Sequence, residues 1–211
     1  MTTTPAQAWT TLQEGNERFI TGVPNHPHQD AGRREELANT QHPVAAIFGC
    51  SDSRLAAEII FDLGLGDAFV IRNAGQVISD SVLGSLEYAV GILNVPLILV
   101  LGHDECGAVR AAIDSQAQDA TPLPPHIAHL IEPIIPAVHR VTGTESGTAI
   151  DPQTVDSRHV GREHLRDTVA EMVKASEMIS AAVADGNLAI VGANYRLHDG
   201  RAVQDIVVGL D

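Results

Sequence analysis

Residues 96–107 read PLILVLGHDECG, and residues 44–54 read VAAIFGCSDSR. Each stretch is a short apolar run that ends at a glycine, and a cysteine and polar side chains follow within four residues. Apolar runs of this length are typical of strands that are buried on both faces, as in parallel sheets. We therefore expect buried strands at 44–49 and 96–101. Their carboxyl ends should lie at the same edge of an open sheet, where ligands collect in such folds.

The rest of the chain continues the alternation of strands and helices. Further strands are expected at 67–71 and 188–192, and helices at 55–61, 79–93, 106–114 and 157–184. A hairpin is expected near the end of the chain, over residues 195–208. This order predicts an α/β fold with a mostly parallel central sheet flanked by helices.

Residues 1–40 predict an N-terminal helical arm, with helices at 6–20 and 31–39. We expect this arm and the C-terminal hairpin to belong to a single domain that spans residues 1–211. Residues 115–125 and 142–156 are expected to be loops, and residues 126–141 have helical periodicity interrupted by two prolines.

The composition limits the classes of function. With 44% hydrophobic and 19% charged residues, the chain should fold into a globular protein. The formal net charge of −14 argues against nucleic acid or an anionic membrane as partner. No apolar run is long enough to span a bilayer, and the N-terminus has no secretory signal, so a cytoplasmic location is expected.

Both cysteines of the chain follow the two central strands, and His103 lies three residues before Cys106. Cysteine and histidine are ligands for Zn²⁺, and three protein ligands leave a fourth tetrahedral position open, as in catalytic zinc sites. We therefore predict that Cys50, His103 and Cys106 hold one Zn²⁺ per subunit. A water in the open position would become acidic enough to supply hydroxide near neutral pH.

Asp52 and Arg54 follow Cys50 at intervals of two residues. If the backbone is locally extended, positions 50, 52 and 54 share a side. Arg54 would then keep the Asp52 carboxylate ionised and oriented toward the metal. Alternatively, Asp52 itself could become the fourth zinc ligand and close the site. We hypothesise that low pH favours Asp52 on zinc and high pH favours Asp52 on Arg54.

The motifs resemble those of the β-class carbonic anhydrases. The matching residues are CSDSR at 50–54, RNAG at 72–75, EYAV at 87–90, and GH at 102–103 with CG at 106–107. The resemblance covers about residues 8–113 and 157–200. It implies that Cys50, His103 and Cys106 are the zinc ligands and that Asp52 and Arg54 form the catalytic pair.

The resemblance also implies a substrate pocket and an assembly. By resemblance, Gln41 hydrogen-bonds substrate from the neighbouring subunit, and Phe69, Ala74, Tyr88 and Gly107 build the apolar pocket for carbon dioxide. Members of the family form dimers or dimers of dimers, so a homodimer or homotetramer is expected.

The implied reaction is the reversible hydration of carbon dioxide to bicarbonate and a proton by zinc-bound hydroxide. Two alternatives remain open. The same metal chemistry could hydrolyse carbonyl sulfide or carbon disulfide, or the chain could be a non-catalytic zinc-binding or redox-sensing protein. Of the nine histidines other than His103, His26 and His28 are expected to be exposed to solvent in a Pro-rich loop, and six others have no motif context: His126, His129, His139, His159, His164 and His198. We expect them to be solvated or locally hydrogen-bonded.

Overall fold

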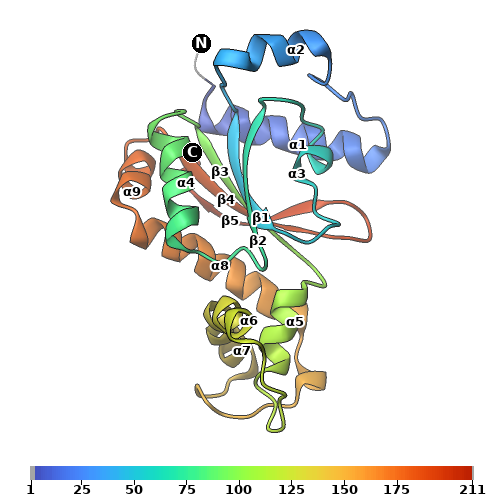
Figure 1. Cartoon of the computed structure of the whole chain (residues 1–211), viewed down its shortest axis with the longest axis vertical. Helices are drawn as coiled ribbons and strands as arrows, with labels where there is room; N and C mark the ends of the chain where they lie inside the picture. The colour runs from blue at the N-terminus through green and yellow to red at the C-terminus, as the bar shows by residue number, and fades with distance from the viewer. Residues whose placement is uncertain (1–2, 211) are drawn as a thin grey trace.

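The computed structural model describes residues 3–210. A five-stranded sheet with the order β2-β1-β3-β4-β5 forms its centre (Figure 1). The strands are β1 (Ala45–Cys50), β2 (Ala68–Asn73), β3 (Leu97–His103), β4 (Ala189–Tyr195) and β5 (Ala202–Val208). β1 to β4 are parallel, and β5 pairs antiparallel with β4. The predicted α/β fold with a mostly parallel sheet is therefore confirmed.

The apolar runs at 44–49 and 96–101 become central strands because both of their faces are covered. Alternate side chains point to opposite faces of a strand. Ile47 and Leu99 contribute to the core on one face, and Phe48 and Val100 to the core on the other. Every residue of β1 and β3 is buried. Such strands have no polar face, which explains their uninterrupted hydrophobicity.

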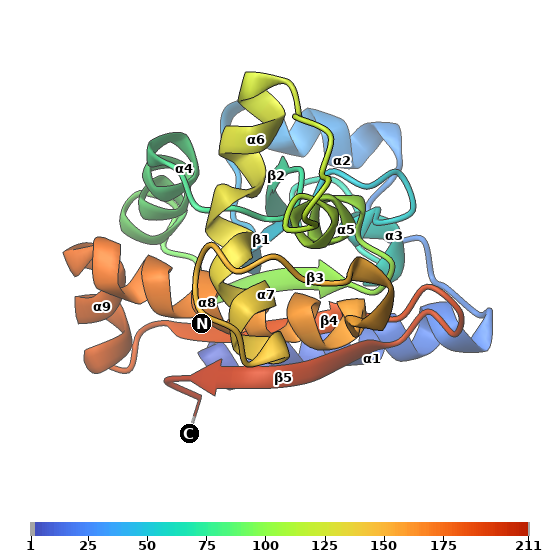
Figure 2. The ribbon, with the colours of Figure 1, turned by 90° about the horizontal axis from the view of Figure 1, so that it is seen from below.

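The helices cover the two faces of the sheet unequally. Helices α1 (Pro5–Thr21) and α3 (Ala57–Ile60) pack on one face, and Figure 2 shows α1 running along that side of the sheet. On the other face lie α4 (Asp80–Gly91), α8 (Ser157–Ala175) and α9 (Glu177–Ala184). The N-terminal segment continues through α2 (Ala31–Glu36) and the 3-10 turn η1 (Leu37–Asn39).

A helical lobe lies beyond the carboxyl ends of the strands (Figures 1 and 2). It consists of α5 (Gly107–Asp114), α6 (Pro125–Ile131), η2 (Glu132–Ile134), α7 (Ile135–Thr142) and η3 (Pro152–Thr154). The carboxyl ends of β1 and β3 therefore lie next to the start of α5, and α8 packs against both β3 and α5. This arrangement encloses the residues that follow the two strands.

The structure corrects two elements of the sequence prediction. The helix expected over 157–184 is interrupted at Ser176, which has extended backbone angles and caps α9 by accepting a hydrogen bond from the Ile179 amide. The Ser176 hydroxyl also donates to Glu87 on α4, at 2.7 Å from its Oε1. The terminal hairpin is formed by β4 itself with β5, so the strand expected at 188–192 extends to Tyr195.

None of the helices within residues 3–210 combines the length and the apolar character that crossing a membrane requires.

Candidate metal centre

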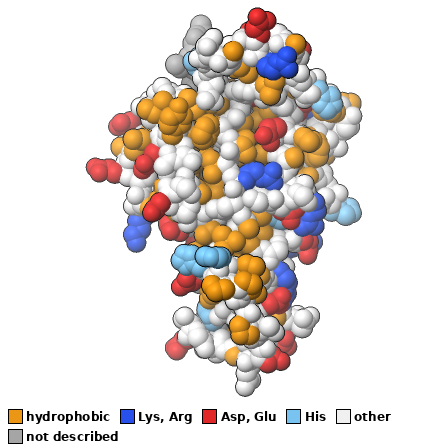
Figure 3. Space-filling view, in the orientation of Figure 1, with side chains coloured by type: hydrophobic (Ala, Val, Ile, Leu, Met, Phe, Trp, Pro, Cys, Tyr) orange, Lys and Arg blue, Asp and Glu red, His pale blue; other side chains and the backbone are white. Residues whose placement is uncertain are grey.

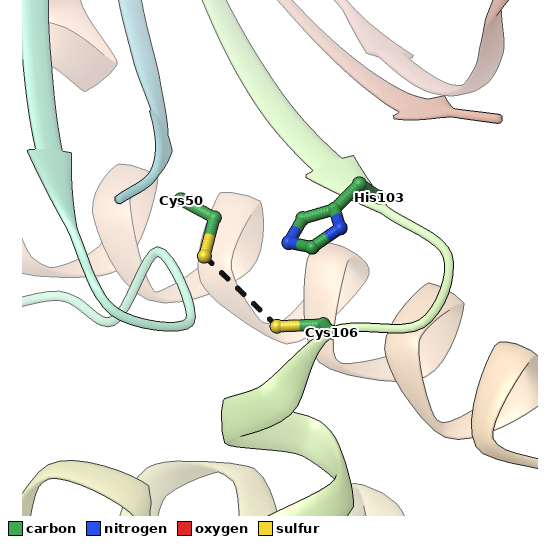
Figure 4. A group of neighbouring side chains, drawn as sticks. All are labelled: Cys50, His103 and Cys106. Carbon is green, nitrogen blue, oxygen red and sulfur yellow. Dashed lines mark hydrogen bonds between the residues drawn. The ribbon is translucent and has the colours of Figure 1, made fainter. Parts of the chain in front are cut away.

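Cys50, His103 and Cys106 lie together where β1 and β3 end (Figure 4). Cys50 is the last residue of β1, His103 is the last residue of β3, and Cys106 is the N-cap of α5. One ligand atom from each lies within 4.8 Å of the others, and all three residues are buried. The structure thus brings together the three side chains that the sequence assigned to the metal.

The spacing between the sulfur atoms fits a tetrahedral metal. The two Sγ atoms are 4.0 Å apart. Two thiolates on one zinc, each about 2.3 Å from the metal, would be separated by about 3.8 Å in tetrahedral geometry. A zinc ion therefore fits between the sulfurs with little displacement of either side chain.

His103 is oriented as a metal ligand. Its Nδ1 donates a hydrogen bond to the carbonyl oxygen of Asp104 at 2.8 Å. This bond places the proton on Nδ1 and leaves a free lone pair on Nε2. Nε2 is buried and has no hydrogen-bond partner in the described part of the chain. A buried nitrogen without a partner is costly, and a metal ion between the sulfurs would satisfy it.

The protonation of the two thiols also favours a cation at this point. The contact with Cys106, together with the hydrogen bond from the Gly75 amide, lowers the pKa of Cys50 well below its ordinary value. The same contact with Cys50, together with burial, raises the pKa of Cys106. One sulfur therefore ionises readily, whereas a second thiolate so close requires a positive charge between the two. Zn²⁺ supplies that charge, so this donor set fits the metal.

The Asp52 carboxylate lies beside this cluster. Its Oδ2 is 4.0 Å from Nε2 of His103. Arg54 binds both carboxylate oxygens, with 2.9 Å from Nε to Oδ1 and 2.8 Å from Nη2 to Oδ2. These hydrogen bonds hold the pKa of Asp52 well below its usual range, so the carboxylate stays ionised.

The backbone around Asp52 differs from the expected extended form. Residues 52–55 form a turn in which the Leu55 amide donates to the carbonyl oxygen of Asp52. The Arg54 amide also donates to Oδ1 of Asp52, at 2.9 Å. The prediction that extended backbone aligns positions 50, 52 and 54 is therefore wrong. The side chains of Asp52 and Arg54 meet because an aspartate turn folds Arg54 back over the carboxylate.

Two neighbouring residues fix the backbone of this segment. Arg72 on β2 donates to the carbonyl oxygens of Cys50 and Asp52, at 3.0 and 2.7 Å. The Gly75 amide donates to Sγ of Cys50 at 3.3 Å. Neither Arg72 nor Gly75 was predicted to act at the metal, although both stand in the RNAG motif.

The residues expected around the substrate are divided between two places. Gln41 and Tyr88 line a groove of about 800 Å³ that contains none of the three metal-site residues. The Phe69 ring lies against Tyr88, with ring centroids 6.1 Å apart. Ala74 is exposed in the turn before Gly75, and Gly107 begins α5 directly after Cys106.

The groove continues into an apolar surface. Figure 3 shows hydrophobic side chains gathered over α4, and the exposed ones there include Tyr88 and Ile92. Leu65, which also lines the groove, is exposed as well.

Of two further buried histidines, His139 has the expected local hydrogen bond, to Thr144, whereas His164 departs from the expectation. His139 and His164 are buried, at 6% and 2% exposure. His139 contacts Thr144 and Gln116 within the helical lobe. His164 on α8 donates to the carbonyl oxygen of Gly75 at 2.7 Å. A contact between residues so far apart in the chain leaves no local signal in the sequence.

The fold and the Cys-His-Cys cluster define a β-class carbonic anhydrase, and the chain belongs to the carbonic anhydrase family, whose model matches residues 45–202. Carbonic anhydrase 2 of Mycobacterium tuberculosis is 51% identical over 201 residues, which cover 95% of this chain and 93% of that protein. A carbonic anhydrase of Mycolicibacterium smegmatis is 45% identical over 197 residues, covering 93% and 91%.

Solved structures share the fold. A tetrameric β-carbonic anhydrase from Sordaria macrospora superposes with a TM-score of 0.71 at 21% identity and covers 83% of this chain and 87% of that one. The Coccomyxa β-carbonic anhydrase superposes with a TM-score of 0.63 at 26% identity, covering 83% and 78%.

Proposed function

We propose that this enzyme binds one Zn²⁺ per subunit through Cys50, His103 and Cys106 and catalyses the reversible hydration of carbon dioxide to bicarbonate and a proton. The observation that carries the proposal is that Nε2 of His103 has no hydrogen-bond partner among residues 3–210 and lies near two thiols and an ionised carboxylate. Family membership and the 51% identical relative, which is named a carbonic anhydrase, support it.

A zinc ion bound there supplies the Lewis acidity that activates water for attack on the carbon of carbon dioxide. Two thiolates donate more negative charge to a metal than imidazoles do, so this zinc would acidify water less than a three-histidine site. A protein group that accepts a hydrogen bond from the reacting water therefore matters more here. Asp52 is the residue we assign to that role.

Arg54 keeps Asp52 available for the role. By binding both carboxylate oxygens it holds the side chain ionised and in one orientation, 4.0 Å from His103. Arg72 holds the backbone on either side of Ser51 through the carbonyl oxygens of Cys50 and Asp52. Metal ligand, carboxylate and guanidinium are thus fixed with respect to one another before substrate arrives.

The apolar substrate pocket would be built across a subunit interface. Gln41 and Tyr88 lie on the exposed apolar groove, and no metal-site residue of the same chain lines it. We propose that the chain forms a homodimer or homotetramer in the cytoplasm, with Gln41 of one subunit contributing to the site of another. Phe69, Ala74, Tyr88 and Gly107 are the residues we assign to the walls around carbon dioxide.

The test is stopped-flow hydration of carbon dioxide with the metal-loaded enzyme, its metal content measured in parallel. Cys50→Ser, or removal of zinc with a chelator, is expected to abolish hydration, and added zinc should restore the chelated enzyme. Ser51→Ala, at the exposed neighbouring position, is the matched control and should retain both zinc and activity. Full activity without zinc would overturn the proposal. Assays of carbonyl sulfide and carbon disulfide on the same preparation would identify a different preferred substrate.

A further inference from the structure

The turn that follows β2 connects the metal site to α8. The Gly75 amide donates to Sγ of Cys50 at 3.3 Å, while the Gly75 carbonyl oxygen accepts from Nε2 of His164 at 2.7 Å. Both peptide groups that flank this glycine are therefore fixed by hydrogen bonds, one at the proposed metal ligand and the other on α8.

Position 75 requires a glycine, and the conformational freedom of glycine makes the turn harder to hold in one conformation. The φ of Gly75 is +80°, and an added Cβ would lie 2.9 Å from Cβ of Ala108. A glycine has more conformational freedom than any other residue, so its amide direction is poorly fixed unless neighbours constrain it. The next residue, Gln76, also has a positive φ, of 43°. The turn needs external support to keep the amide directed at the sulfur.

The described residues supply that support from two sides. On one side, the Asn73 side chain donates a hydrogen bond to the carbonyl oxygen of Val77 and accepts one from the amide of Val77. On the opposite side, His164 binds the carbonyl oxygen of Gly75. One helical turn later, the Thr168 hydroxyl lies 3.4 Å from the carbonyl oxygen of Gln76.

His164 is suited to a fixed donor role. It is 2% exposed, and burial lowers its pKa, which keeps the ring neutral. Because its Nε2 faces a carbonyl oxygen, the proton must lie on Nε2. Its Nδ1 has no partner among the residues that the structure describes, so the contact with Gly75 is the one polar contact that orients the ring there.

We infer that His164 is a positioning residue for the metal centre: its hydrogen bond to the Gly75 carbonyl holds the Gly75 amide on the Cys50 sulfur. The inference rests on the proposed zinc site. An N–H···S hydrogen bond stabilises the negative charge of a thiolate and fixes the direction of its sulfur, and a metal ligand needs both. Groups that orient metal ligands in this way affect metal affinity or activity by about 10- to 100-fold.

The test compares His164→Phe, which fills a similar volume without a donor, with His164→Gln, whose side-chain amide can replace the donor. His139→Phe is the matched control, because His139 is also buried and hydrogen-bonded but lies in the helical lobe with partners unrelated to Cys50. Zinc affinity is measured by competition with a chromogenic chelator. The thiolate-to-metal charge-transfer band is recorded on the cobalt-substituted proteins.

We expect His164→Phe to bind zinc about 10- to 100-fold more weakly and to shift the cobalt charge-transfer band. His164→Gln should restore most of the affinity and the original band, and His139→Phe should match the unchanged chain. Unchanged affinity and band in His164→Phe would overturn the inference. Equal losses in His164→Phe and His164→Gln, or in His139→Phe, would also overturn it, since they would indicate general loss of packing.

If His164→Phe does not fold, a measurement on the unsubstituted protein still tests the inference. Nitrogen-15 spectra of the zinc-loaded protein should show His164 as a neutral ring, protonated on Nε2, with a slowly exchanging proton from pH 5 to 8. A charged ring or a proton on Nδ1 would overturn the inference. Absence of the cobalt–thiolate band from the unchanged chain would be a different result, because it would overturn the metal site itself and this inference with it.

Discussion

The guanidinium of Arg54 binds both oxygens of the Asp52 carboxylate, at 2.9 and 2.8 Å, and the same carboxylate lies 4.0 Å from the free nitrogen of His103. Bidentate pairs of this kind fix orientation as well as charge. Asp52 is therefore held within reach of the metal centre but directed at Arg54. Which of the two it binds should determine whether the site is open to water.

Arg54→Ala should release Asp52 and lower the rate of carbon dioxide hydration by about 10²-fold or more, because the water-orienting carboxylate loses its fixed position. Metal content should stay the same, since no proposed ligand changes. Stopped-flow kinetics and metal analysis check both points. Arg166→Ala, which removes a surface arginine paired with Asp205, is the control. Activity of Arg54→Ala within threefold of the control would contradict the role of the pair.

The coordination of the metal is expected to change with pH. At low pH the Asp52 carboxylate should bind zinc, and at high pH it should bind Arg54 instead. The reason is that water competes better for the fourth position on zinc as it loses its proton. Arg54 keeps the pKa of Asp52 low, so the carboxylate is ionised across this range and its own protonation does not drive the change. Crystal structures of the zinc-loaded enzyme at pH 5.5 and 8.5 would check this. The same fourth ligand at both values would contradict it.

Asp62 should stabilise the N-terminal segment in a pH-dependent way. Its side chain is 1% exposed and accepts hydrogen bonds from Arg18 and from the amides of Asn25 and His26. Burial alone would raise the pKa of Asp62, but these donors outweigh it and the pKa is lowered. The stabilisation is thus fully present above the unfolded-state pKa of about 4 and is lost as the pH falls through the lower folded-state value.

Asp62→Asn is expected to reduce the free energy of unfolding by about 2–4 kcal/mol at pH 7, because it removes the charge that Arg18 faces. Urea unfolding at pH 7 and pH 3 measures the effect. The difference between the variant and the unchanged chain should shrink at pH 3. A difference that is equally large at both values would show that the charge of Asp62 is not the cause.

Gly15→Ala should destabilise the fold by several kcal/mol, because a Cβ at position 15 would collide with the backbone oxygen of Phe61 and force α1 away from the sheet. Gly161→Ala in α8 is the matched control, since no atom from another described part of the chain lies within 4 Å of the Cβ it would add. That substitution should be neutral or stabilise by about 0.5–1 kcal/mol. Thermal unfolding of both variants measures the difference, and similar losses would contradict the packing argument.

The sequence was sufficient to predict the metal cluster because its geometry follows from strand ends. Cys50 and His103 each end a strand that is apolar throughout, and the parallel pairing of those strands places both residues at one edge. Asp52 and Arg54 were predicted to pair, but for the wrong reason, since an aspartate turn and not extended backbone brings them together.

The features that the sequence did not predict depend on contacts between distant segments. The contact from His164 to Gly75 requires α8 to pack behind the sheet, and no local pattern records it. The break at Ser176 follows from its hydrogen bond to Glu87 on α4, whereas the helical periodicity continues across it. Gln41 and Tyr88 share an exposed groove that none of the three metal-site residues lines, so the pocket that they were expected to build with the metal site does not follow from one chain. Tertiary contacts decided each of these features over local propensity.

Neighbouring strands β1 and β3 carry ligands that are far apart in the chain, because β2 and α4 intervene between them. A ribosome therefore finishes Cys50 well before it reaches His103 and Cys106. Until β3 docks beside β1, the chain offers an arriving metal ion either Cys50 alone or the separate pair of His103 and Cys106, and neither holds it tightly. Tight capture requires the pairing of β1 with β3, so metal uptake would favour molecules in which these two strands have docked over molecules in which they have not.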